Sequence, residues 1–242
     1  MTPERKARLK AVLARRQPDL SLIADRVHKP RNVAALVRHA DAVGIHRIHC
    51  IAPKEGYRFR GTTQGSDRWV ETVNHDSFSD AIAAVRSEGM KVYAAHFSDR
   101  AVDYRDVDYT VPCAILMGAE KYGVSDQAAA QADEHILIPM MGMVSSLNVS
   151  TAAGIILVEA QQQRLKAGLY DQPRLPEEVQ ARKLFEWGHE TLVQFCRQKN
   201  LAYPPYDLEG EMIDAPAWNK QVQNGTAPQY QWLQSDVKQD DV

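Results

Sequence analysis

The segment Asn32-Val-Ala-Ala-Leu-Val-Arg38 contains an amide and a guanidinium, groups that can hydrogen-bond a ligand and stabilise negative charge. At 3.6 residues per turn these two side chains lie about 120° apart, so the spacing alone does not make them a pair. A helix cap at Asn32 and a surface arginine at Arg38 remain open alternatives.

Two glycines five residues apart follow an apolar run in Leu116-Met-Gly-Ala-Glu-Lys-Tyr-Gly-Val-Ser125. Glycines there let the backbone turn sharply and approach a ligand. The Lys-Ser/Thr pair of a phosphate loop is missing, and the chain contains no G-x-G-x-x-G, which disfavours a nucleoside triphosphate or a nicotinamide cofactor. Glu120 stands between the glycines without an evident structural need.

A third segment, Ile138-Pro-Met-Met-Gly-Met-Val-Ser-Ser-Leu-Asn148, joins an expected strand to a helix start. Its methionines can fill a core or line a slot for an apolar or adenine-sized ligand. Metal chemistry has little support, because His46 and His49 would point to opposite faces of a strand. The three cysteines form no C-x-x-C pair, and we predict no catalytic metal.

Alternating strands and helices must position these three segments. Strands are expected over residues 20–27, 47–52, 90–96, 111–117 and 134–138. Helices are expected over residues 3–16, 32–43, 78–87 and 148–166, with a short one after Ser125 and more helix within 175–199. This order predicts an α/β fold with a largely parallel sheet, whose ligands bind beside the strand ends.

We expect four parts in the chain. Residues 1–19 form a basic helical extension that binds RNA, 20–168 the main domain, 169–205 a C-terminal helical extension and 206–242 an irregular or mobile tail. Residues 53–77 are expected to be an irregular loop, functional or mobile.

The net charge of −2 hides an asymmetry, since residues 1–38 carry ten Lys/Arg against three acids. A local basic patch can bind phosphates, although a solvated helix face is an equal alternative. No apolar run approaches the roughly 18 residues that span a bilayer. The N-terminal residues lack the apolar part of a secretory signal, so we expect a cytoplasmic location without membrane contact.

Taken in order, these segments resemble the TrmH family of the SPOUT methyltransferase superfamily. The resemblance rests on five stretches: Ala14-Arg-Arg-Gln-Pro-Asp-Leu20, His28-Lys-Pro-Arg-Asn-Val33, Arg38-His-Ala-Asp-Ala-Val-Gly44, Ile115-Leu-Met-Gly-Ala-Glu-Lys-Tyr-Gly123 and residues 138–149. It implies a SPOUT fold with a C-terminal trefoil knot, and a homodimer in which the partner subunit contributes to the active site. The implied reaction transfers a methyl group from S-adenosylmethionine (AdoMet) to a ribose 2′-hydroxyl in RNA, with guanosine 18 in the tRNA D-loop as the expected target.

The resemblance also assigns roles to single residues. Arg38 matches the catalytic arginine, and the other catalytic positions are Asn32, Glu120, Ser146 and Asn148. Backbone groups of four residues would hold AdoMet: Ala95, Gly118, Ile138 and Leu147. Four arginines match RNA-binding positions: Arg8, Arg15, Arg16 and Arg164.

Two departures from the family and two rival functions belong to this interpretation. Gln162-Gln-Arg164 keeps only the second arginine of an R-x-R pair, and residues beyond about Pro216 have no clear counterpart. A ribosomal RNA 2′-O-methyltransferase of the same family would share the knot motifs. A non-catalytic RNA-binding protein would be expected to have lost Arg38, Glu120 or Asn148, and all three are present.

Overall fold

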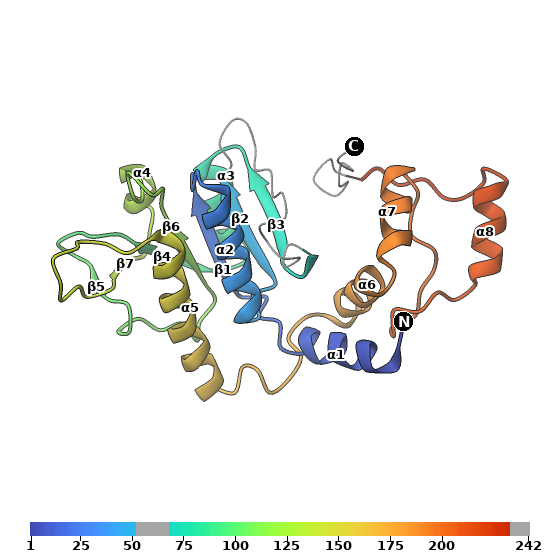
Figure 1. Ribbon diagram of the computed structural model, residues 1–242, viewed down its shortest axis with the longest axis horizontal. Helices are drawn as coiled ribbons and strands as arrows, with labels where there is room; N and C mark the ends of the chain where they lie inside the picture. The colour runs from blue at the N-terminus through green and yellow to red at the C-terminus, as the bar shows by residue number, and fades with distance from the viewer. Residues whose placement is uncertain (52–67, 233–242) are drawn as a thin grey trace. The chain divides into compact units, whose positions relative to one another are not determined.

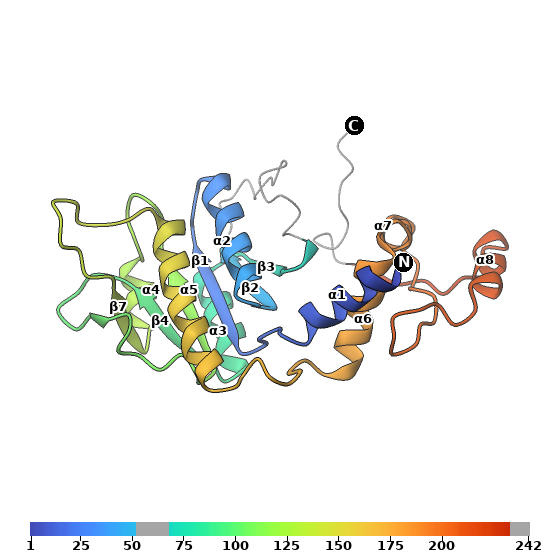
Figure 2. The ribbon, with the colours of Figure 1, turned by 60° about the horizontal axis from the view of Figure 1, so that its bottom comes forward.

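The computed structural model describes residues 1–51 and 68–232 (Figures 1 and 2). The chain forms two compact units. One unit is Arg15–Arg174, and the other combines Met1–Ala14 with the residues from Leu175 onward. The sequence-based boundaries placed the first and last extensions in separate parts, whereas the structure groups them in one unit.

The larger unit is built on a seven-stranded sheet with the order β3-β2-β1-β6-β4-β7-β5. Its strands are β1 (Leu20–Asp25), β2 (Arg47–Ile51), β3 (Glu71–His75), β4 (Lys91–Ala95), β5 (Val102–Asp103), β6 (Cys113–Met117) and β7 (Glu134–Leu137). Every neighbouring pair is parallel. The predicted α/β fold with a parallel sheet is therefore confirmed.

Helices cover both faces of this sheet, as expected for a parallel sheet that is buried on both sides. Helices α2 (Pro30–Ala42) and α5 (Val149–Lys166) pack side by side over one face (Figures 1 and 2). Helix α3 (Phe78–Ser87) and the short α4 (Asp126–Ala130) contribute to the core on the other face.

The residues of the central strands alternate between the two cores, because successive side chains of a strand point to opposite faces. In β1, Leu20, Leu22 and Ala24 belong to the core under α2 and α5, whereas Ile23 belongs to the core under α3 and α4. All six positions of β1 are buried, which explains why its sequence reads as a continuous apolar run with one serine and one aspartate.

Two strands were missed by the sequence analysis. β3 lies at the sheet edge, where four of its residues are half-buried and Asn74 is exposed, so its sequence Glu-Thr-Val-Asn-His shows no apolar run. The irregular loop predicted for residues 53–77 is thus wrong for Glu71–His75, while residues 52–67 lie outside the described part. β5 is only two residues long and is defined by its pairing with β7.

The smaller unit contains four helices within its described residues: α1 (Pro3–Leu13), α6 (Glu177–Gly188), α7 (Glu190–Gln198) and α8 (Ala215–Gln223). Helix α1 packs on α6. A core around Cys196, Leu201 and Trp218 holds the chain after α7, and the Trp232 indole N–H donates to the Leu201 carbonyl. The expected irregular tail is therefore wrong for α8, because Trp218 gives this segment an apolar anchor.

No helix within residues 1–51 and 68–232 has the length and apolar character needed to cross a bilayer. The trefoil knot that the family resemblance implies stays a prediction.

Candidate active site

Four neighbouring strands end at one edge of the sheet and present the segments that the sequence analysis singled out. In the order β1-β6-β4-β7, the ends are Asp25, Met117, Ala95 and Leu137. Because the strands are parallel, the loops that follow them begin at the same edge, which is where open α/β sheets bind ligands. The sheet order thus places Asn32, Gly118, Ala95 and Ile138 in or directly beside four adjacent loops.

Glu120 joins two of these loops directly. Its carboxylate accepts hydrogen bonds from the backbone N–H groups of His28 and Lys29, each at 3.1 Å, and from the Asn32 amide at 2.7 Å. The Asn148 amide in turn donates to the Asn32 side-chain oxygen at 3.3 Å. Glu120, Asn32 and Asn148, one from each sequence segment, therefore form one hydrogen-bonded chain.

Burial of the Glu120 carboxyl raises its pKa, but the hydrogen bonds that it accepts lower it more, so the pKa lies below its ordinary value. The carboxylate is thus charged at neutral pH. It accepts the N–H groups at the start of α2, where negative charge is favoured by the helix dipole. This accounts for the carboxylate between the two glycines that had no evident structural role.

Asn148 has a second function as the N-cap of α5. Its side-chain oxygen accepts hydrogen bonds from the Ser150 backbone N–H at 2.9 Å and the Ser150 hydroxyl at 2.7 Å. Asn32, by contrast, lies inside the first turn of α2, whose N-cap is Lys29. Asn32 is also buried, so it is not the simple helix cap that its position in the sequence allowed.

Asp25 makes a further link that the sequence analysis missed. It is buried at the end of β1, and one carboxylate oxygen lies 3.4 Å from the Ser125 hydroxyl that caps α4. Burial raises the pKa of this carboxyl above its ordinary value, and the charge of Arg26 and hydrogen bonds from Ser125 counteract that rise. An acidic residue at the end of an apolar strand was the signal available in the sequence.

Residue 118 must be glycine because two backbone stretches of this loop lie very close together. The backbones of Ala119 and Gly123 exchange hydrogen bonds at 3.0 and 2.8 Å. A Cβ atom at Gly118 would overlap with backbone atoms of Gly123 and Val124. The loop therefore closes tightly only because residue 118 is glycine, and it brings backbone rather than side chain to the sheet edge.

The segment from Ile138 to Leu147 offers its backbone to a ligand or a partner. Between β7 and Asn148, no hydrogen bond with the described residues is made by the backbone groups of residues 138–147. Met141 and Met143 are 94% and 102% exposed, so they are not core filler in this chain. Ser146 is also exposed and makes no contact with Asn148 or Glu120 through a hydrogen bond.

Arg38 lies on the exposed surface of α2, outside the hydrogen-bonded chain of Glu120, Asn32 and Asn148. The neighbouring His39 lies on the side that packs against α5, where a Cβ at Gly154 would be 3.5 Å from its ring. Burial and the charge of Arg38 lower the His39 pKa below its ordinary value. The structure thus unites three of the five predicted catalytic residues and leaves Arg38 and Ser146 apart from them.

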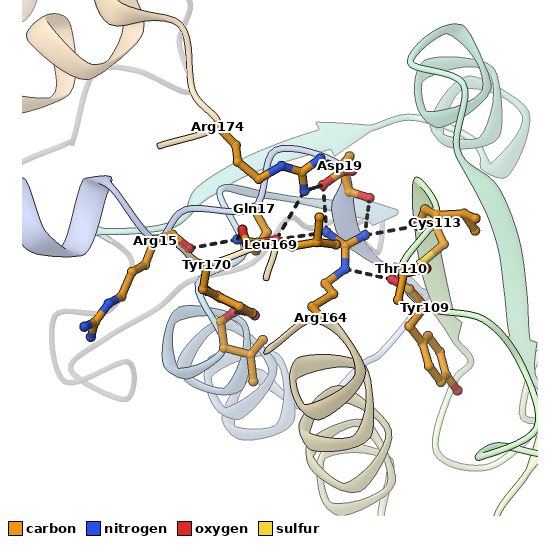
Figure 3. Close-up of polar contacts among 12 residues, drawn as sticks. Arg15, Gln17, Asp19, Tyr109, Thr110, Cys113, Arg164, Leu169, Tyr170 and Arg174 are labelled. Atoms are coloured by element: carbon orange, nitrogen blue, oxygen red, sulfur yellow. Dashed lines mark hydrogen bonds and ion pairs between the residues drawn. The ribbon is translucent and has the colours of Figure 1, made fainter. Parts of the chain in front are cut away.

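Arg164 was predicted to bind RNA, and the structure contradicts this. Its side chain is 0% exposed and inserts between the start of β1 and the loop before β6 (Figure 3). It bonds Asp19 at 2.7 Å, Gln17 at 3.0 Å and the Tyr109 and Val111 carbonyls at 2.8 and 3.0 Å. Arg174 holds the same Asp19 carboxylate. Arg164 therefore has a structural role, because it joins the end of α5 to the residues just before β1.

Arg16 is likewise buried rather than available to RNA. Its guanidinium is 0% exposed, pairs with Asp41 at 2.6 Å and donates to the Ile45 carbonyl at 2.8 Å. Its neighbour Arg15 is exposed, and Figure 3 shows its guanidinium directed away from the Arg164 cluster. Arg15 and Arg16 look alike in the sequence, because Asp41, the partner of Arg16, is 25 positions away.

Fewer basic side chains of residues 1–38 are available to a ligand than the sequence suggests. Lys6 pairs with Glu209 and Glu211, and Lys10 pairs with Glu209, all within the smaller unit. Arg8 on α1 is exposed, and like Arg15 it has no ion pair within the described residues. Of the four predicted RNA-binding arginines, Arg8 and Arg15 therefore remain available to a phosphate.

No group of three or more metal-binding side chains occurs within residues 1–51 and 68–232. His49 on β2 does contact a second histidine, but this is His75 on β3, at 2.9 Å between ring nitrogens and with the rings stacked. Burial, reinforced by the charges of His75 and Arg47, lowers the His49 pKa to about 4.

Known proteins resemble this chain along most of its length. Residues 19–158 match the SpoU rRNA Methylase family and residues 162–215 the C-terminal family of SpoU rRNA methylases. A tRNA (guanosine(18)-2'-O)-methyltransferase of Escherichia coli is 48% identical over 90% of this chain and 97% of its own length. A protein of the same name from Thermus thermophilus is 49% identical over 77% of this chain and 96% of its own.

Solved structures agree with these matches. The crystal structure of a TrmH/SpoU tRNA modifying enzyme of Aquifex aeolicus has a TM-score of 0.74 with 39% identity, and the match covers 78% of this chain and 98% of that one. An AdoMet-bound rRNA methyltransferase of Sinorhizobium meliloti has a TM-score of 0.56 with 30% identity, over 64% and 59% of the two chains. With Asn32, Glu120 and Asn148 joined at the carboxyl edge of a parallel sheet, and with its main unit matched almost throughout, the chain belongs to the SpoU rRNA methylase family.

Proposed function

We propose that this protein transfers a methyl group from AdoMet to the 2′-hydroxyl of guanosine 18 in the D-loop of tRNA. The observation that carries the proposal is the hydrogen-bonded chain Glu120–Asn32–Asn148, which unites three distant segments at the ligand-binding edge of the sheet. The choice of tRNA rests on the Escherichia coli and Thermus thermophilus relatives that carry this activity in their names.

The residues at the sheet edge fit AdoMet. The Gly118 loop brings backbone close to a ligand because residue 118 lacks a Cβ, and residues 138–147 leave their backbone polar groups free for one. We assign AdoMet binding to the backbone of Ala95, Gly118, Ile138 and Leu147, which hydrogen-bond the polar edges of the molecule. AdoMet supplies a methyl group on a sulfonium, which is already a good donor.

The protein must then position the ribose hydroxyl and stabilise its developing charge. Holding the reacting groups in line supplies several kcal/mol of the barrier. Arg38 is assigned to charge stabilisation or to the adjacent phosphate rather than to proton abstraction, because a guanidinium stays protonated in proteins. Glu120, Asn32 and Asn148 fix the starts of α2 and α5, and Ser146 completes the loop before α5.

The active form is proposed to be a homodimer. Helix α5 leaves Val158 and Leu165 exposed, and these lie on one face with Thr151 and Ile155 by helical periodicity. The nearby loop exposes Met141, Met143 and Val144. Two adjacent segments with five large exposed apolar side chains favour an interface between copies. A partner subunit would also supply what one chain leaves apart, namely Arg38 next to the AdoMet loops.

The RNA surface of this proposal uses Arg8 and Arg15, and no longer Arg16 or Arg164, whose guanidinium groups are buried. Arginine suits phosphate contacts, which position an RNA without reading its sequence. The cytoplasmic location expected from the sequence is part of the same proposal. A ribosomal RNA target has weaker support, since a 23S rRNA (guanosine-2'-O-)-methyltransferase of Vibrio parahaemolyticus is 34% identical over 64% of this chain.

One experiment tests both the site and the atom. Labelled AdoMet is supplied with two tRNAs that differ only at position 18, which carries guanosine in one and 2′-deoxyguanosine in the other. The proposal expects label in the first tRNA alone. Equal labelling of both would exclude the 2′-hydroxyl of residue 18 as the acceptor. In a parallel reaction with rRNA, label in the rRNA but in neither tRNA would favour the ribosomal alternative.

A second experiment tests the shared site. Arg38→Ala and Gly118→Val are prepared separately, each expected to be inactive, then mixed under conditions that exchange subunits. If Arg38 of one subunit serves the AdoMet loops of the other, mixed dimers contain one intact site and activity returns. Mixed dimers that form but remain inactive would place Arg38 and AdoMet in the same subunit.

A further inference from the structure

Arg31 and Arg38 lie on the same face of α2. They are seven residues apart, which corresponds to two turns of an α-helix with a residual rotation of about 20° and a separation of about 10.5 Å along the axis. Ala35 and Ala42 lie on the same stripe, so no large side chain separates or covers the two guanidinium groups.

This stripe lies to one side of the residues through which α2 contacts α5. Asn32 bonds Asn148 at the start of α5, and His39, about two turns further along α2, packs near Gly154. At 100° per residue, these two residues point about 80–120° away from Arg31 and Arg38. Both arginines are exposed, so the stripe belongs to the surface of the larger unit.

Most arginines of this unit are occupied by groups of the protein itself. Arg47 pairs with Glu88, Arg86 with Asp133, and Arg105 with Asp103. Among the arginines that the structure describes between residues 15 and 174, only Arg15, Arg31 and Arg38 have no hydrogen bond or ion pair from their side chains. Two of these three, Arg31 and Arg38, lie on the same stripe of α2.

The residues at the start of α2 do not occupy the Arg31 guanidinium. Its first turn contains no acidic residue, and its N-cap Lys29 makes no side-chain cap. Glu120 accepts the His28 and Lys29 backbone N–H groups and the Asn32 amide, while the Arg31 guanidinium remains outside this contact. Glu120 thus offsets the dipole at the start of α2, and an anion near Arg31 would meet a guanidinium that makes no hydrogen bond or ion pair within the described residues.

We propose that Arg31 is a substrate-positioning residue that binds a backbone phosphate of the RNA, next to the nucleotide served by Arg38. This inference rests on the proposed function and extends it to a second contact on the same helix. A guanidinium binds a phosphate through two parallel hydrogen bonds, which fixes the register of the strand. Arg31 thereby sets where the RNA backbone lies, and Arg38 acts at the reacting ribose.

The test compares Arg31→Ala with a matched control, Arg105→Ala, which also removes one exposed positive charge from the same unit but from a pair with Asp103. Loss of a charge-assisted phosphate contact is expected to raise the KM for tRNA roughly tenfold in Arg31→Ala, with kcat and the affinity for AdoMet unchanged. The slope of log affinity for tRNA against log salt should fall by about 0.7–0.9, the value for one phosphate. Arg105→Ala should leave both quantities as they are.

Arg31→Lys separates charge from geometry. It is expected to keep the salt slope while recovering only part of the affinity, because lysine lacks the planar fork. The inference is overturned if Arg31→Ala binds tRNA with unchanged affinity and salt slope. It is also overturned if Arg31→Ala changes the oligomeric state, since Arg31 would then contact the partner subunit. Failure of the proposed function would appear elsewhere, as a wild-type protein that does not methylate residue 18.

Discussion

The Asn32 amide donates a 2.7 Å hydrogen bond to the Glu120 carboxylate across 88 positions of sequence. Because the same carboxylate accepts the backbone N–H groups of His28 and Lys29, one side chain holds the loop after β1 against the loop after β6. The only other carboxylate link between these segments within the described residues is the longer contact of Asp25 with Ser125 at 3.4 Å, so the relationship between the two loops depends strongly on Glu120.

Glu120→Gln should weaken both stability and activity. An amide presents an N–H₂ group to at least one of the three converging donors, so the unfolding free energy should fall by about 1–3 kcal/mol. AdoMet affinity and turnover should fall with it. Glu134→Gln, at an exposed position on β7, is the matched control and should change neither. Urea unfolding and calorimetric AdoMet binding measure the effect, and equal behaviour of the two variants would contradict it.

Arg38→Ala should lower the kcat of methyl transfer by roughly a hundredfold or more if Arg38 stabilises developing charge. Its guanidinium is exposed and has no partner within the described residues, so the melting temperature and AdoMet affinity should stay unchanged. Arg38→Lys should recover little, because an ammonium lacks the planar geometry of a guanidinium. A parallel loss of AdoMet binding would instead make Arg38 structural.

Gly118→Ala should disrupt the loop that approaches AdoMet. The added Cβ would overlap with the Gly123 backbone, so the loop must open and both AdoMet affinity and thermal stability should drop. Gly142→Ala adds the same methyl group where nothing lies within 4 Å, and its melting temperature should remain that of the wild type. Thermal melts with and without AdoMet distinguish the two. A wild-type affinity in Gly118→Ala would remove this loop from the site.

Arg164→Met should destabilise the protein by about 3–5 kcal/mol, because it leaves Asp19 with one of its two arginines and deprives several buried carbonyls of their donor. Gln162→Met, on the exposed side of the same helix, should cost little. At temperatures where Arg164→Met remains folded, its tRNA affinity should match the wild type. A selective loss of tRNA binding without loss of stability would restore Arg164 as an RNA contact.

The His49–His75 contact predicts a loss of stability in mild acid. The His49 pKa is about 4 in the folded protein and about 6.5 in the unfolded chain. The contribution of His49 to the free energy of unfolding is therefore fully present above pH 6.5. It is lost as the pH decreases toward 4, by about 3 kcal/mol at most. His49→Gln should lose less stability than the wild type between pH 7 and 4.5 in urea titrations. Parallel curves for the two proteins would assign the acid sensitivity to other groups.

Glu120 also contributes to the pH dependence of stability, in the same direction as His49 but over a lower pH range. Its pKa is lowered on folding, so its contribution is present above its ordinary pKa and is lost as the pH falls through the lower folded value. The two effects can be separated, since that of His49 begins near pH 6.5 and that of Glu120 begins below about 4.5.

Local patterns were sufficient to predict the central sheet. The buried strands β1, β2, β4, β6 and β7 appear in the sequence as short apolar runs between helical segments, because both faces of a parallel sheet are covered. The caps of α4 and α5 could also be predicted, at Ser125 and Asn148, since capping depends on neighbouring residues. β3 escaped because an edge strand with half-buried polar residues has no such run.

The candidate site was only partly predictable, for a related reason. Asn32, Glu120 and Asn148 were grouped by family resemblance, and helical spacing alone does not reveal that they are bonded. Arg16 and Arg164 were misassigned because an arginine buried against a distant acid cannot be distinguished locally from an exposed one. The partner of Arg164, Asp19, is 145 positions away.

The contact between Asn32 and Asn148 also orders events in time. These residues are 116 positions apart, so the first part of the site leaves the ribosome well before the last. At the usual 5–20 residues per second, that interval is roughly 6–23 s. For the first 88 of these positions the start of α2 has neither Glu120 nor Asn148 to hold it, and until Asn148 is made the nascent chain carries no assembled methyl-transfer site. Competence for the reaction is therefore acquired late in synthesis, when α5 begins to form.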